Sequence, residues 1–386
     1  MRIARRMKTL GTETAFLVLA RARELEAQGK HIVHLEIGEP DFDTPSNIKA
    51  AAKKGLDDGF THYGPASGLP ELRKAIAEYT ARSLGIKCSG EQVVVTPGGK
   101  PIMFFGILAC IDEGDEVIYP NPGFPIYESV INFAGAKPVP LVLKEEKGFG
   151  YDIDDLRKLI TEKTRMLIIN SPANPTGGVL TKEDLARIAE LVVKHDLYVL
   201  SDEIYSRILY DGFKHTSIST FPGMAERTII LDGFSKTYAM TGWRLGWGVM
   251  PEPLVPYVSQ LQINCTSCTS SFSQIAGMEA LTGKQDEVDK MVAEFKRRRD
   301  VIVDGLNGIR GFRCHKPLGA FYVFPSITGT GKSSRQLSDF LLNEAGVACL
   351  SGTAFGAFGE GYLRFSYANS VENIQLALER IRKAVS

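Results

Sequence analysis

Lys236 stands in an unusual place for a lysine, in the run SKTYAMTGWR directly after the apolar stretch TIILDGF. That stretch predicts a buried strand, and lysines are rarely fully buried without a partner. Desolvation lowers the pKa of a lysine, so its amine can act as a nucleophile. Such an amine suits Schiff-base formation with a carbonyl, above all with pyridoxal phosphate (PLP). PLP also needs a phosphate site, an acid for its ring nitrogen and groups that hold the substrate.

A phosphate site is predicted in VVVTPGGKP, where Gly98 and Gly99 precede Pro101 between a predicted strand and a predicted helix. Proline suits the start of a helix, where free N–H groups bind anions and glycines allow close approach. Ser235 and Arg244 can add a hydroxyl and a guanidinium to the same phosphate. The alternative interpretations are a purely structural Gly-Gly turn and an arginine on the rim.

Asp202 follows the predicted strand LYVLS and begins the run DEIY. An acid at the carboxyl end of a strand can hold the proton of a pyridine nitrogen. Tyr205, three residues later, can reach the O3′ oxygen of such a ring. A helix N-cap for Asp202 and a packed aromatic ring for Tyr205 are the competing interpretations.

Asn174 and Arg364 are candidates for holding the ligand. Asn174 lies in SPANPTGG, where two prolines and two glycines predict a rigid turn that can present the amide. Arg364 lies in GYLRFSYA, on the opposite face of a predicted strand from its apolar neighbours. A guanidinium matches a carboxylate with two hydrogen bonds. An ordinary turn and a salt-bridged arginine are the alternatives.

Strands alternating with helices must position these side chains. This pattern predicts a mostly parallel, doubly wound sheet between roughly residues 90 and 250, with ligands at the carboxyl ends of its strands. The expected strands are 91–97, 115–120, 137–143, 165–170, 197–205, 227–234 and 244–250. Helices are expected at 12–30, 45–56, 101–111 and 181–196, the last opening with a TxxD capping pattern.

The chain after residue 283 predicts a smaller α+β unit, with helices at 284–306 and 372–385 and strands at 312–317, 319–325 and 362–368. A length of 386 residues suggests about two domains. We expect a large PLP-binding domain over 46–282. We expect a small domain formed by 1–45, including a short strand in 31–38, together with 283–386.

Composition excludes several classes of protein. Lys plus Arg and Asp plus Glu both number 45, so the zero net charge gives no basic surface for nucleic acid. No run of 18 apolar residues predicts a membrane span, and we expect a soluble cytoplasmic protein. Cys265 and Cys268 form a CxxC without a second pair or nearby histidines, so we expect two ordinary cysteines and no metal site.

The ordered motifs GGK, NPTG, SDEIY, SKTYAMTGWR and YLRFSYA resemble those of the class I, fold-type I PLP-dependent aminotransferases. The similarity is greatest to the bacterial and archaeal aspartate/aromatic branch, and it runs from LEIGEPDFDTP to ENIQLALERI. The resemblance implies an α/β fold with a large and a small domain, and a reaction that moves an α-amino group between an amino acid and a 2-oxo acid.

The resemblance also implies a role for each candidate residue. Lys236 would form the Schiff base and move the proton, Asp202 would pair with the ring nitrogen, and Tyr205 and Asn174 would contact O3′. The phosphate would be surrounded by Gly98, Gly99, Lys100, Ser235 and Arg244.

Four further residues complete the site by resemblance. Arg364 would bind the substrate α-carboxylate, and Gly38 would close over it by backbone contact. Phe124 stands where aspartate aminotransferases usually stack a tryptophan, and it lacks the indole N–H donor. Tyr63, in FTHYGPASG, matches a tyrosine that reaches the phosphate of the neighbouring subunit, which implies a homodimer.

The sequence carries conflicting signals on whether the substrate is an acidic or an uncharged amino acid. Lys100 matches a lysine near the distal carboxylate of acidic substrates, which favours aspartate and glutamate with 2-oxoglutarate. Against this, ETAFLVL replaces a small S-x-T pattern, Phe124 replaces tryptophan, and Gly233 stands where many relatives have a phosphate-binding serine. A broad aromatic or alanine-type aminotransferase is the alternative, followed by a β-lyase or a cyclopropane-forming synthase of the same fold.

Overall fold

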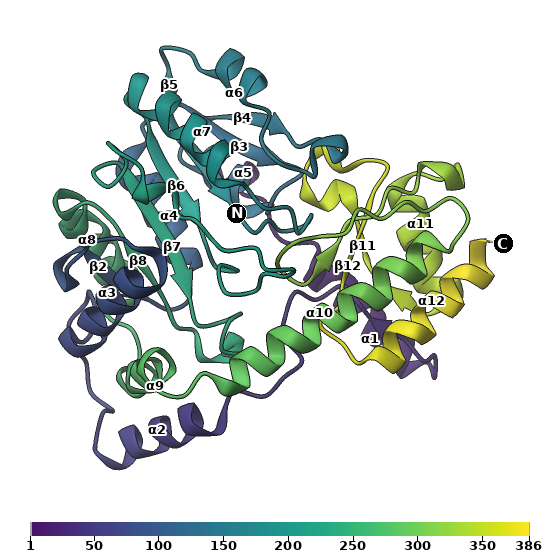
Figure 1. Ribbon diagram of the computed structural model, residues 1–386, viewed down its shortest axis with the longest axis horizontal. Helices are drawn as coiled ribbons and strands as arrows, with labels where there is room; N and C mark the ends of the chain where they lie inside the picture. The colour runs from purple at the N-terminus through teal and green to yellow at the C-terminus, as the bar shows by residue number, and fades with distance from the viewer. Residues whose placement is uncertain (1, 386) are drawn as a thin grey trace.

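A seven-stranded sheet forms the centre of the protein in the computed structural model, which describes residues 2–385 (Figure 1). Its strand order is β2-β8-β7-β6-β5-β3-β4, and β8 alone runs antiparallel to its two neighbours. The mostly parallel, doubly wound sheet predicted from the sequence is therefore confirmed. The strands are β2 (Val93–Thr96), β3 (Glu116–Asn121), β4 (Lys137–Val142), β5 (Thr164–Asn170), β6 (Tyr198–Asp202), β7 (Thr228–Gly233) and β8 (Gly246–Val249).

Helices cover both faces of this sheet, which is why apolar side chains occur on both faces of its central strands. In β5, Met166 and Ile168 pack in the same core cluster as Ile102 of α4 (Lys100–Cys110). The alternate residue Leu167 packs instead in the cluster of Leu185 from α7 (Lys182–Lys194). The expected TxxD capping box of α7 is present, with the Thr181 hydroxyl accepting from the Asp184 N–H at 3.1 Å.

The other helices of this part surround the sheet at its edges and ends. They are α2 (Ser46–Asp57), α3 (Pro70–Leu84), α5 (Ile126–Phe133), α6 (Ile153–Leu159), α8 (Val255–Thr266) and α9 (Ser271–Thr282). The Ser/Thr-rich segment with the CxxC lies at the end of α8 and in the turn before α9. Its thiols, Cys265 and Cys268, are free.

The remaining elements form a second layer around a three-stranded antiparallel sheet, β11-β12-β9. Its strands are β9 (Tyr322–Val323), β11 (Leu350–Ser351) and β12 (Leu363–Ser366). A separate pair of parallel strands joins β1 (Val33–His34) to β10 (Val347–Ala348). The helices are α1 (Ala15–Ala27), α10 (Asp286–Asn307), α11 (Ser334–Phe340) and α12 (Val371–Val385).

The strand predicted at 312–317 is wrong. Within it, only Arg313 forms a bridge, to Ser326. The Asn307 side chain takes both backbone groups of Cys314, accepting from its N–H at 2.8 Å and donating to its carbonyl at 3.0 Å. Because these groups are already paired, they cannot extend a sheet.

Helix α10 runs from the neighbourhood of α9 to the second layer, as Figure 1 shows in green. Two adjacent arginines on it contact different segments. Arg298 forms an ion pair with Asp41 at 2.6 Å, whereas the fully buried Arg299 pairs with Asp211 at 2.7 Å. One core cluster also joins Tyr205, beyond β6, with Phe295 of α10. The division at residues 46 and 283 stays a prediction.

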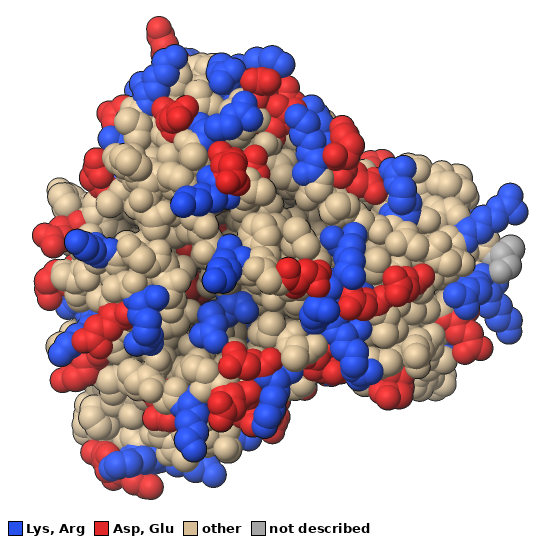
Figure 2. All heavy atoms as spheres, in the orientation of Figure 1, with Lys and Arg blue, Asp and Glu red and all other residues tan. Residues whose placement is uncertain are grey.

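Charged side chains of both signs are interspersed over the face shown in Figure 2. This distribution agrees with the zero net charge of the sequence. None of the helices described by the structure is long and apolar enough to cross a membrane.

Close packing of β8 against the loop after β2 generates a testable prediction. A Cβ atom on Gly246 would lie 2.5 Å from the backbone of Gly98 and Gly99. We expect Gly246→Ala to lower the free energy of unfolding by about 1–3 kcal/mol, because backbone must move to relieve the clash. Urea denaturation measures the change.

Gly242→Ala is the matched control, since a Cβ there would meet nothing within 4 Å. Its unfolding free energy should stay within about 0.5 kcal/mol of wild type. Equal stability of the two variants would contradict the packing argument.

Candidate active site

A cavity of about 520 Å³ lies at the carboxyl ends of the parallel strands. Asn170 ends β5, Asp202 ends β6, and Ser235 and Lys236 follow β7. Most of the predicted site residues line it: Gly38, Gly99, Lys100, Phe124, Asn174, Asp202, Tyr205, Ser235, Lys236, Arg244 and Arg364. Gly98 adjoins Gly99, whereas Tyr63 does not line this cavity and is 89% exposed.

Lys236 places its amine inside the cavity. Its Nζ donates to the Gly38 carbonyl at 2.5 Å and lies 5.9 Å from the centre of the Phe321 ring. Burial lowers the pKa of Lys236 to about 8, although the negative charges of Glu39 and Glu13 act against this. A substantial fraction of the amine is therefore neutral near physiological pH and can act as a nucleophile or base.

The Asp202 carboxylate is buried beside the cavity. It accepts the Tyr127 hydroxyl at 2.6 Å and the Ile204 N–H at 3.3 Å. Burial raises the pKa of Asp202 to about 6, although the hydrogen bond from Tyr127 acts in the opposite direction. Asp202 accepts the Ile204 N–H in a turn and lines the cavity, and no helix begins directly after it, so the helix N-cap interpretation is wrong. Tyr127 was not found from the sequence.

Arg364 is buried, and no carboxylate of the described residues forms an ion pair with it. Its guanidinium donates to the Glu36 carbonyl and to Asn174 Oδ1 at 3.3 Å, and it lies over the Tyr322 ring at 4.6 Å. Its Nε has no partner among the described residues. The salt-bridge alternative is therefore wrong, and a buried cationic donor remains available to a ligand.

Tyr205 and Tyr322 form a buried pair at the wall of the cavity. Their hydroxyls are 2.8 Å apart, and both tyrosines line the cavity. Tyr322 thus connects Tyr205 to Arg364, whose guanidinium it also contacts. Its role could not be read from the sequence, where it is one aromatic in a predicted apolar strand.

The loop after β2 has the features of an anion site. Gly98 adopts φ +91°, and a Cβ on it would collide with the guanidinium of Arg244. Arg244 itself is left-handed at φ 50°, a conformation rarely adopted by residues other than glycine and frequent at functional sites. Glycines, a helix N-terminus and an arginine together can bind a phosphate.

Gly233 lies in β7 and is not one of the residues that line the cavity. A Cβ on it would stand 3.1 Å from Gly246 Cα and 3.2 Å from the Ile204 side chain. Glycine therefore fits the close contact between β7 and β8 at this position.

Lys100 begins α4 at the edge of the cavity and forms an ion pair with Glu13. Its ammonium also lies 5.4 Å from the centre of the Phe124 ring. Glu13 lines the cavity but was not singled out as a site residue in the sequence, because its partner is far away along the chain.

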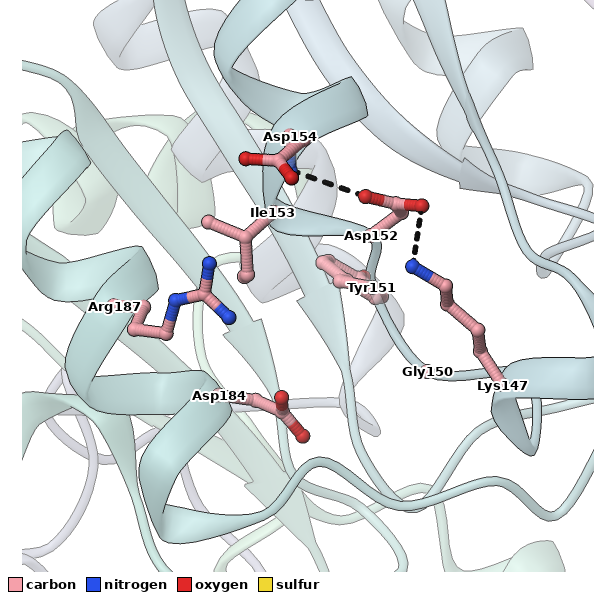
Figure 3. Close-up of a pocket in the computed structure, with 8 residues that line it drawn as sticks. All are labelled: Lys147, Gly150, Tyr151, Asp152, Ile153, Asp154, Asp184 and Arg187. Carbon is pink, nitrogen blue, oxygen red and sulfur yellow. Dashed lines mark hydrogen bonds and ion pairs between the residues drawn. The ribbon is translucent and has the colours of Figure 1, made fainter.

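A smaller hollow of about 160 Å³ lies beside α6 and α7, and none of the predicted site residues lines it (Figure 3). Its carboxylate Asp152 pairs with Lys147 at 2.6 Å and accepts the Asp154 N–H at 3.1 Å. These groups are mutually satisfied, so the larger cavity is the candidate active site.

Comparisons with known proteins agree over nearly the whole chain. A family model described as aminotransferase class I and II matches residues 30–381. An aspartate aminotransferase of Pyrococcus abyssi is 45% identical over 365 residues, 94% of each chain. Aromatic-amino-acid aminotransferase 2 of Thermococcus litoralis is 45% identical over 363 residues, 93% of each chain. The structure of Thermus thermophilus aspartate aminotransferase with maleate superposes with a TM-score of 0.95 at 39% identity, covering 100% of both chains.

The raised pKa of Asp202 predicts a pH dependence of stability for the cofactor-free protein. Its pKa is about 6 in the folded state, whereas an ordinary aspartate has a pKa of about 3.8, so the folded state binds more protons between these values. Stability from this group is therefore lost as the pH rises from about 4 to about 6, by roughly 3 kcal/mol. In Asp202→Asn this loss should disappear from urea unfolding free energies measured across that range.

Asp154→Asn is the control, because this aspartate lies at the surface with 67% of its side chain exposed. Its unfolding free energy should fall between about pH 4 and pH 6 as steeply as that of the wild type. If the unfolding free energy of Asp202→Asn depends on pH as that of the wild type does, the Asp202 carboxyl of the wild type has an ordinary pKa.

Proposed function

The chain belongs to the class I and II aminotransferases and is a PLP-dependent transaminase, and we propose that its amino-acid substrates are aspartate and glutamate, with 2-oxoglutarate as the oxo-acid partner. The two half-reactions follow one another in a ping-pong mechanism. The aspartate aminotransferases among its relatives support the acidic donor.

One observation carries the assignment of the site. A single cavity contains the Lys236 amine with a lowered pKa, the buried Asp202 carboxylate, and the Arg364 guanidinium with an unpaired Nε. These are the three groups needed to move a proton, hold a ring nitrogen and bind a carboxylate.

The residues present fit PLP. Gly99, Ser235 and Arg244 line the cavity, and together with Gly98 they would hold its phosphate. The following groups would hold its ring: Asp202 at the nitrogen, Tyr205 and Asn174 at O3′, and Phe124 by stacking. When bound, PLP supplies an electron sink that stabilises the negative charge left on Cα by proton removal.

Lys236 moves the proton in this proposal. Its neutral Nζ accepts the proton from the substrate Cα, and the lowered pKa of about 8 leaves more of this amine neutral near pH 7 than an ordinary lysine would have. In the structure, the Lys236 amine donates a hydrogen bond to the Gly38 carbonyl at 2.5 Å. Asp202 would stay ionised once PLP is bound, because a cationic ring N–H favours its charged form.

Arg364 binds the α-carboxylate of the substrate, assisted by Asn174, whose Oδ1 orients the guanidinium at 3.3 Å. Burial among Tyr322 and Phe355 excludes water and strengthens this charged hydrogen bond. Gly38 borders the same space through its backbone, and a side chain there would collide with the Tyr322 hydroxyl.

Lys100 supports an acidic substrate, since it lies in the same cavity as Arg364 and its ammonium can bind a second carboxylate. An aromatic donor is the second candidate. It is favoured by the apolar side chains of Phe16, Met103 and Phe124 in the lining and by the aromatic-amino-acid relative.

A homodimer is part of the proposal. Tyr63 is 89% exposed in the single chain, and other large apolar side chains are exposed as well, among them Leu17 (64%) and Tyr257 (62%). A second copy covering them would bring Tyr63 to the phosphate site of its neighbour.

The substrate class is tested by half-reactions of the PLP form with single amino acids. Aspartate and glutamate should bleach the cofactor absorbance faster than phenylalanine or alanine, although by a modest factor, because only they offer a carboxylate that can replace Glu13 at Lys100. The reverse order would establish the aromatic or alanine-type alternative. Release of ammonia and pyruvate instead of amine transfer would establish a β-lyase.

Lys236→Ala should reduce turnover of aspartate and 2-oxoglutarate by roughly three to six powers of ten, because no other group replaces its amine. A coupled assay for the oxo-acid product measures the loss. Lys290→Ala, whose side chain is 73% exposed, should retain wild-type activity. Full activity of Lys236→Ala would remove this lysine from the mechanism.

A further inference from the structure

Glu13 places a carboxylate in the active-site cavity immediately before α1. Its side chain is 20% exposed, and one oxygen forms an ion pair with Lys100 Nζ. We propose that Glu13 stands in for the distal carboxylate of the substrate and thereby sets the selectivity between acidic and uncharged amino acids. This inference rests on the proposed aminotransferase function of the same cavity.

The distribution of charges in the cavity singles out this pair. Lys100, Lys236, Arg244 and Arg364 all line it, and of these four only Lys100 forms an ion pair within the described residues. The cation suited to a second substrate carboxylate is therefore neutralised by a side chain of the protein itself.

The negative charge of Glu13 also extends to the groups that hold the reacting end of the substrate. Burial lowers the pKa of both Lys236 and Arg364, and the charge of Glu13 acts against this in each. A substrate carboxylate placed between Arg364 and Lys100 would thus lie in the field of Glu13 and be repelled by it.

Two classes of substrate meet this pair differently. An acidic side chain must displace Glu13 from Lys100, so it exchanges one carboxylate for another and gains little. An uncharged side chain leaves the pair intact and packs on Phe124 without facing an unpaired ammonium. Glu13 therefore reduces the preference for acidic substrates and allows uncharged ones to bind.

Displacement needs only a local rearrangement. Glu13 precedes the first helical residue, Ala15, and the segment before it is held on α5 by two hydrogen bonds between Gly11 and Ser129, at 2.8 and 3.3 Å. A rotation of the Glu13 side chain releases Lys100 while these contacts persist.

Binding of unreactive analogues tests the proposal. Dissociation constants of succinate and 3-phenylpropionate are measured by calorimetry on the PLP form of the wild type and of Glu13→Gln. Succinate should bind roughly tenfold more tightly to the variant, and 3-phenylpropionate equally or more weakly. In turnover, the ratio of kcat/KM for aspartate over phenylalanine should rise by a similar factor.

Glu39→Gln is the matched control, because Glu39 lines the same cavity but binds Thr241 instead of Lys100. It removes the same charge without freeing Lys100 and should leave the ratio of the two dissociation constants unchanged.

An unchanged or weaker succinate affinity in Glu13→Gln would overturn the proposal. So would an equal change for both ligands, or the same selectivity shift in Glu39→Gln. Failure of the proposed function would be seen separately, as a wild-type protein that transaminates none of the four amino acids tested in half-reactions.

Discussion

The register of three neighbouring parallel strands determines the active site. Asn170 at the end of β5 lies opposite Asp202 at the end of β6, and Asp202 lies opposite Leu231 of β7. Because side chains alternate along a strand, a slip of one residue would turn Asp202 away from the cavity. The helices on both faces fix this register through apolar contacts. The position of Asp202 therefore depends on packing contacts that extend well beyond the active site.

Burial then gives the polar groups their chemical character. The same dry surroundings lower the pKa of Lys236, raise that of Asp202 and leave Arg364 without a carboxylate among the described residues. Hydrogen bonds to neutral partners, such as Tyr127 and Asn174, orient these groups without cancelling their charge. The cavity thus keeps reactive groups unpaired at the reacting end, whereas Lys100 at its edge is already paired with Glu13.

The sequence allowed the sheet and most of the lining to be predicted, because glycines and polar residues follow apolar strands there. Lys236, Asp202 and Gly99 are examples, and all three line the cavity. Tyr127, Tyr322 and Glu13 escaped prediction because their partners are distant in the chain and no local pattern marks the contact. The prediction of a strand around Cys314 was wrong for the same reason, since the Asn307 side chain at the end of α10 hydrogen-bonds to the backbone of Cys314.

The two adjacent arginines of α10 tie this helix to two different segments near the active site. Arg298 is tied to Asp41, close to the glycine that contacts Lys236, and Arg299 is tied to Asp211, beyond the strand that carries Asp202. With 22 residues the helix is about 33 Å long. Because the two ion pairs leave adjacent residues of one helix, any displacement of α10 would act on both segments at once.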